Sequence, residues 1–78
     1  MAYEQGRYRI VIGSPPDRKD ISVEIFVDNI QWAEVHDEPG YPVVDFCQPS
    51  GGAPEIKVSD ALDLLNRAVK ILEDRPRK

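Results

Sequence analysis

The fold is decided by the stretch ISVEIFVDNIQWAEVHDEPGYPVVDFC, residues 21–47, because apolar and polar side chains alternate along three runs within it. Residues 21–28 alternate without a break, with Ile, Val, Ile and Val on one face and Ser, Glu, Phe and Asp on the other. This period of two is typical of a β-strand with one buried face. Residues 30–36 and 42–47 repeat the pattern, so the stretch predicts three consecutive strands.

Turn signals separate these three runs. Asp28 and Asn29 tolerate turn conformations and favour a tight hairpin between the first two runs. Residues 38–41, Glu-Pro-Gly-Tyr, place proline and glycine at the central positions of a type II turn, where proline supplies a fixed φ and glycine a positive one. Tight turns of this kind predict that neighbouring strands are antiparallel.

The flanking segments add one or two strands and a helix. Residues 7–12, RYRIVI, alternate and predict a strand, and residues 55–58, EIKV, could form a short fifth one. From Ser59 onward the apolar residues recur at helical spacing and form one stripe. Ser59 or Asp60 is the expected N-terminal cap of this helix, and Pro76 is expected to end it.

These elements predict an α+β fold in a single domain, residues 1–78. We expect an antiparallel β-meander of four or five strands with the one C-terminal helix packed on one face. Residues 75–78, RPRK, are expected to form a flexible basic tail. One helix covers only one face of a sheet, so the other face is left open to solvent or to a partner.

The register of the first hairpin has two solutions, which differ in the face that Trp32 occupies. A three-residue turn places Phe26 opposite Trp32 and Glu24 opposite Glu34, all on the open face. A two-residue turn places Trp32 in the core and also places Glu34 among the core residues. Burial of an unpaired carboxylate is costly, which favours the first register. Its weakness is Ile30, a β-branched residue unsuited to positive φ, which a longer or bulged turn would relieve.

Charge is distributed unevenly along the chain, although the net charge is only −4. Residues 20–63 contain ten acidic residues and one base, Lys57, whereas both ends are basic. An acidic surface repels phosphate and attracts cationic surfaces. We therefore expect a basic protein as partner and no nucleic acid.

Targeting signals are not evident in the sequence. The N-terminal residues MAYEQGRYRI do not form a signal peptide, and no apolar run reaches the roughly 20 residues of a membrane span. Cys47 is the only cysteine, which excludes an intrachain disulfide. These features predict a soluble cytoplasmic protein that does not enter a membrane.

The open face carries the candidate partner-binding residues. We expect Phe26 and Trp32 to act as aromatic anchors, because tryptophan is enriched at the centres of protein interfaces. Glu24, Glu34 and Asp45 are expected to steer a basic partner toward them. Two alternatives remain: the aromatic residues stiffen the sheet as cross-strand pairs, or two copies of the chain bury them in a homodimer.

Catalytic and metal-binding roles have less support. Residues 36–38, His-Asp-Glu, point to alternate faces of a strand and cannot easily share a metal ion, so His36 is expected to be an exposed residue near the turn. Glu24 and Glu34 could share a proton, which makes a small hydrolase the third hypothesis. A Cys47 nucleophile lacks an orienting group. We therefore expect no catalytic residue, no metal and no cofactor.

The C-terminal helix carries a family resemblance. Residues 58–72, VSDALDLLNRAVKIL, follow the strands in a pattern that resembles small antitoxins of the HicB type, whose sheet is also followed by a helix with this apolar spacing. In its small size and acidic character the chain is also similar to bacterial immunity proteins and phage-encoded inhibitors, which neutralise basic nucleases. These resemblances imply an inhibitory, non-enzymatic binding role.

Overall fold

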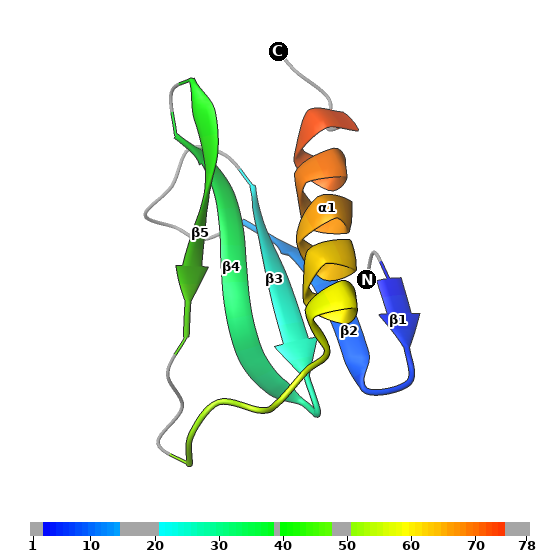
Figure 1. Cartoon of the computed structure of the whole chain (residues 1–78). Helices are drawn as coiled ribbons and strands as arrows, with labels where there is room; N and C mark the ends of the chain where they lie inside the picture. The colour runs from blue at the N-terminus through cyan, green and yellow to red at the C-terminus, as the bar shows by residue number, and fades with distance from the viewer. Residues whose placement is uncertain (1–2, 15–20, 39, 48–50, 75–78) are drawn as a thin grey trace.

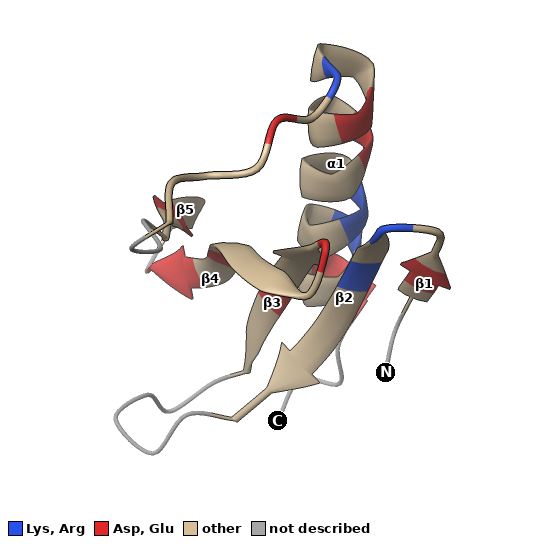
Figure 2. Ribbon diagram, turned by 90° about the horizontal axis from the view of Figure 1, so that it is seen from below, with Lys and Arg blue, Asp and Glu red and all other residues tan. Residues whose placement is uncertain are grey.

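The computed structural model describes residues 3–14, 21–38, 40–47 and 51–74. These residues contain five strands and one helix, in the order β1 (Tyr3–Gln5), β2 (Tyr8–Gly13), β3 (Ser22–Val27), β4 (Ile30–Glu38), β5 (Tyr41–Phe46) and α1 (Val58–Asp74). Neighbouring strands are antiparallel and follow one another across the sheet in chain order. The helix lies on one side of the sheet (Figure 1, Figure 2). The predicted α+β meander is therefore confirmed.

The fifth strand lies near the N-terminus and not at residues 55–58. Residues 55–57 have no regular secondary structure, and the helix begins at the next residue. β1 pairs instead with β2 across a turn at Gly6, whose φ of 59° glycine adopts without steric cost. Tyr3 packs against the core, and the Arg67 guanidinium lies 4.2 Å from its ring centroid. These contacts with α1 help to hold a strand that is too short to show alternation.

The turn between β3 and β4 is the two-residue turn of the less favoured register. Asp28 and Asn29 have φ angles of 54° and 66°, and two successive positive φ angles are the signature of a type I′ hairpin turn. Val27 pairs directly with Ile30 on either side of this turn. Ile30 is therefore a strand residue, and the steric objection to a positive φ at this position does not arise.

A β-bulge then restores the favoured register along the rest of the hairpin. The pairing shifts by one residue, and Trp32 is the extra residue of β4. Glu24 lies opposite Glu34, as that register predicts, but Phe26 lies opposite Gln31. The predicted Phe26–Trp32 pair is therefore wrong. The bulge reconciles a two-residue turn with a strand that keeps Glu34 off the core-facing side.

The second predicted turn joins β4 to β5. Glu38 pairs with Tyr41, and Gly40 has a φ of 100°, the positive value that a type II turn requires at this position. Pro39 lies outside the described residues, as does the predicted basic tail at 75–78.

The core lies between α1 and the middle of the sheet. Its buried cluster comprises Ile10, Val23, Ile25, Ala33, Val35, Leu64, Ala68 and Leu72. The three helical members are spaced four residues apart and form the inner stripe of α1. This stripe packs mainly against β3 and β4, two neighbouring strands of the sheet.

The helix begins one residue before the predicted caps. The Ala61 amide donates a 2.9 Å hydrogen bond to the Lys57 carbonyl, so Ser59 and Asp60 lie inside the first turn. The predicted cap is therefore wrong. Asp60 is used differently, because its carboxylate accepts a hydrogen bond from the Tyr8 hydroxyl.

Candidate functional site

Three acidic residues occupy neighbouring positions on the face of the sheet away from α1. The register places Glu24 of β3 opposite Glu34 of β4, and Glu34 opposite Asp45 of β5. Directly opposed side chains have Cβ atoms only about 5 Å apart. We call Glu24, Glu34 and Asp45 the acidic row, and Figure 2 marks acidic positions on these three strands. The sequence predicted all three residues for this face, and the tertiary structure brings them together.

The Cys47 thiol lies close enough to the acidic row for its pKa to respond to the charges there. Burial raises its pKa above the usual value, and the negative charges of Glu34, Asp45 and Glu24 raise it further. Both causes disfavour the thiolate, which is the nucleophilic form of cysteine. Both causes therefore favour the thiol form of Cys47.

His36 is buried, with only 4% of its surface exposed, so the expectation of an exposed histidine near the turn is wrong. The reason is that β4 continues to Glu38, which leaves His36 inside the ladder opposite Val43. Its Nε2 lies 2.8 Å from Asp45 Oδ2, and its Nδ1 lies 3.5 Å from Glu38 Oε1. His36 therefore positions the outermost carboxylate of the acidic row.

Phe26 is covered by a cation that the sequence reasoning missed. Arg9 of β2 lies directly opposite Phe26, with its guanidinium carbon 4.6 Å from the ring centroid. This distance is typical of a cation–π contact. The alternation of residues 7–12 already placed Arg9 away from the core, but a pairing with Phe26 required the register of two strands. Phe26 is therefore half-buried beneath a positive charge.

Trp32 makes its aromatic contact with β5. Its ring meets Phe46 edge-on, with centroids 5.4 Å apart and planes at 62°, a favourable geometry for two aromatic rings. Trp32 is half-buried and packs against the core cluster, whereas Phe46 is 57% exposed. The structure thus separates the two predicted anchors: Phe26 lies with Arg9 on the face away from α1, whereas Trp32 packs with Phe46 and the core cluster on the helix side. The expected place of Trp32 on the open face is therefore wrong.

A groove between α1 and β5 was not expected from the sequence. We call it the β5 groove; it has a volume of about 130 Å³ and is lined by Val35, Pro42, Val43, Val44, Leu65 and Val69. A helix with side chains is about 10–12 Å across, whereas five strands spaced about 4.8 Å apart span roughly 19 Å. One helix cannot cover this width. The strand count alone could therefore have predicted an uncovered strip.

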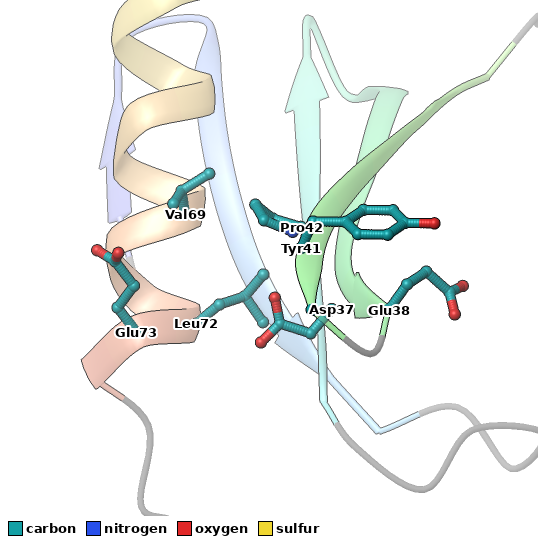
Figure 3. Close-up of a pocket in the computed structure, with 8 residues that line it drawn as sticks. Asp37, Glu38, Tyr41, Pro42, Val69, Leu72 and Glu73 are labelled. Atoms are coloured by element: carbon teal, nitrogen blue, oxygen red, sulfur yellow. The ribbon is translucent and has the colours of Figure 1, made fainter.

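A second hollow continues the β5 groove toward the β4–β5 turn. It has a volume of about 280 Å³, shares Pro42 and Val69 with the groove, and has Leu72 on its floor. Three carboxylates line it, from Asp37, Glu38 and Glu73, and Figure 3 shows Asp37 beside Leu72 of α1. We call it the acidic hollow.

Within residues 3–14, 21–38, 40–47 and 51–74, no three His, Cys, Asp or Glu side chains are grouped to hold a metal ion. The one helix described is not long and apolar enough to cross a membrane.

No protein-family model, curated protein or solved structure matches this chain.

Proposed function

We propose that this protein is a non-enzymatic interaction module of the antitoxin, immunity or inhibitor type, which binds a basic protein through its acidic sheet surface. The acidic row is the observation that carries the proposal. Directly opposed like charges destabilise a sheet. Glu24 against Glu34 and Glu34 against Asp45 make two such pairs in succession, so acidic residues are concentrated along one line across three strands, and this negative charge attracts a cationic surface.

The surrounding charges support a basic partner over a nucleic acid. Asp45 is the most accessible member of the row, with 57% of its side chain exposed at the edge strand. The acidic hollow adds carboxylates on the other side of the same strand. Such a field accelerates encounter with a positively charged protein and slows encounter with phosphate backbones. The lone Cys47 is compatible with a reducing cytoplasm, which we propose as its compartment.

Neutralising the acidic row tests the proposal. The triple variant Glu24→Gln/Glu34→Gln/Asp45→Asn should remain folded, because each amide keeps the size of the carboxylate and an oxygen that accepts hydrogen bonds, and should lose capture of basic proteins from the source cell. The matched control is Glu55→Gln/Asp63→Asn/Asp74→Asn, which removes the same charge elsewhere and should retain capture. Equal capture by both variants would refute the proposal. A salt-insensitive dimer in sedimentation would instead favour self-association.

A further inference from the structure

β5 is an edge strand, and its backbone geometry exposes a hydrogen-bonding row. The Cys47 amide donates a 2.9 Å hydrogen bond to the Trp32 carbonyl, and the β4–β5 register continues unbroken to Glu38 opposite Tyr41. Hydrogen-bonded and non-bonded pairs alternate in an antiparallel ladder. The backbone groups of residues 42, 44 and 46 therefore point away from β4, and the described residues place no strand beyond them.

The proline of β5 fits this geometry. Pro42 lacks an amide hydrogen, and its nitrogen falls on the outward side, where a central strand would need a donor but an edge strand does not. Among the described residues, no backbone acceptor pairs with the outward amides of Val44 and Phe46. An edge of this kind is a ready template for another strand, and proteins usually guard it with lysine or proline. Here the guard is limited to one end of the strand.

The two sides of β5 differ in chemistry. On the helix side, Val44 lines the β5 groove, and Phe46 is 57% exposed. On the other side, Asp45 ends the acidic row. An added strand alternates its side chains between the same two sides. Apolar residues opposite Val44 and Phe46 would therefore bury exposed apolar surface, while a basic residue opposite Asp45 would meet a carboxylate.

The acidic hollow extends the pattern by one position. A residue opposite Pro42 points to the helix side, where the apolar floor of the hollow leads to Asp37 and Glu73. A lysine or arginine fits such a place, because its aliphatic stem packs on apolar surface while its charged end meets carboxylates. Figure 3 shows the Asp37 carboxylate beside Leu72, and Glu73 on the adjoining part of α1.

Self-pairing of β5 is disfavoured by the same charges. A second copy added at this edge would continue the sheet with its own Asp45 and Glu34, so that two acidic rows would lie in one extended line. Repulsion of this kind selects against a like partner and in favour of an oppositely charged one.

We propose that β5 binds an extended segment of the basic partner as a sixth strand. The segment carries apolar residues opposite Val44 and Phe46 and basic residues opposite Pro42 and Asp45. The inference rests on the proposed function, since it names how the basic partner is held. Backbone hydrogen bonds supply the affinity and the two-sided pattern supplies the specificity, as in other cases of strand addition.

The test uses the full chain and a synthetic peptide of about ten residues in which valine and lysine alternate, except that the residue placed opposite Pro42 is also a lysine. Binding should shift the amide resonances of Val44 and Phe46 in ¹⁵N-labelled protein and protect these amides from hydrogen exchange. A peptide of the same composition with all lysines before all valines should bind at least roughly tenfold more weakly, because it matches the charge without the alternation.

Two further arms remove the outward hydrogen bonds. Alternate amides of the bound peptide face β5, and the others face solvent. N-methylation of the amides that face β5 should weaken binding by roughly tenfold, whereas N-methylation of the other set should leave binding nearly unchanged. Val44→Pro removes the outward amide of β5 and should weaken binding similarly. The peptide arm leaves the protein intact, so the test survives if Val44→Pro fails to fold.

The outcomes separate this inference from the proposed function. Strand addition would be overturned if both N-methylated peptides and the peptide with all lysines before all valines bound equally well. If the neutralised acidic-row variant lost binding in the same experiment, the basic-partner proposal would still stand. Absence of binding by every lysine-containing peptide, together with unchanged capture by the acidic-row variant, would overturn both.

Discussion

The Tyr8 hydroxyl donates a 2.6 Å hydrogen bond to the Asp60 carboxylate and joins two residues that are 52 positions apart in the sequence. The bond connects the first residue of β2 with the first turn of α1. It is also the main reason why the pKa of Tyr8 is raised above its usual value. The helix is thereby attached to the N-terminal side of the sheet, away from β5.

Tyr8→Phe should lower the Tm at neutral pH, because Asp60 loses its donor. The pKa of Tyr8 is raised in the folded state, so the bond contributes fully below the ordinary value of 10.0 and is lost as pH rises through the folded value. The difference in Tm between wild type and variant should therefore vanish at high pH. Tyr41→Phe, at a tyrosine that is 62% exposed, is the control and should have little effect. An unchanged Tm for Tyr8→Phe at neutral pH would contradict the assignment.

Substitutions at Asn29 test the turn that sets the hairpin register. Asn29→Gly should be neutral or stabilising, because glycine adopts the observed φ of 66° freely. Asn29→Val should lower the free energy of unfolding by about 1–2 kcal/mol, since a β-branched residue is strained at positive φ. Urea denaturation monitored by Trp32 fluorescence measures both. Equal stability of the two variants would show that residue 29 does not occupy this conformation in solution.

Leu64→Ala tests the packing of α1 on the sheet. Leu64 is 1% exposed, so its truncation should cost about 2–5 kcal/mol of unfolding free energy. Leu62→Ala, two residues away and 57% exposed, should change stability by no more than about 0.5 kcal/mol. Leu64→Met keeps the volume and serves as the measurable substitute if Leu64→Ala does not fold. Similar losses at positions 62 and 64 would mean that the helix is rotated about its axis.

Acid titration tests the ion pair between Arg7 and Asp28. The two side chains form hydrogen bonds of 3.0 and 2.6 Å between the turns of the two hairpins, and these bonds lower the pKa of Asp28 below 3.8. The contribution to stability is therefore present above pH 3.8 and is lost as pH falls through the folded value. Asp28→Asn, which tolerates the same turn, should lower the Tm slightly at neutral pH. A difference that persists at the lowest pH would argue against the ion pair.

Thiol reactivity tests the field of the acidic row. Cys47 should react with iodoacetamide at pH 8 more slowly than a free cysteine, because burial and three carboxylates raise its pKa. Glu34→Gln should increase the rate, which should nevertheless stay below that of a free thiol because burial remains. Glu55→Gln is the control and should leave the rate unchanged. A rate insensitive to Glu34 would place the acidic row away from Cys47.

Features that depend on local interactions were predicted from the sequence, whereas features that depend on distant contacts were not. The three alternating runs and the helical stripe are local patterns, and β3, β4, β5 and α1 form where these patterns predict them. The bulge at Trp32 was not predicted, because it results from a competition between the turn and the distant part of the ladder. The sequence indicated the two-residue turn and the Glu24–Glu34 pairing separately. Both can form together only because one extra residue is inserted in β4.

The candidate site divides in the same way. Alternation placed Glu24, Glu34 and Asp45 on the face away from the helix, and the strand pairing sets them side by side. The Arg9 cover on Phe26 and the Trp32–Phe46 contact depend on which strands are neighbours and in what register. Sequence periodicity does not contain that information.

The sequence by itself determined that this chain forms an antiparallel sheet with one amphipathic helix and an acidic middle, because hydrophobic period and charge are properties of short segments. Only the tertiary structure decided which residues meet: the bulge that turns Trp32 toward Phe46, the burial of His36, the three-residue strand β1 and the uncovered groove along β5. These features depend on contacts between segments far apart in the chain, and on the simple fact that one helix is narrower than five strands.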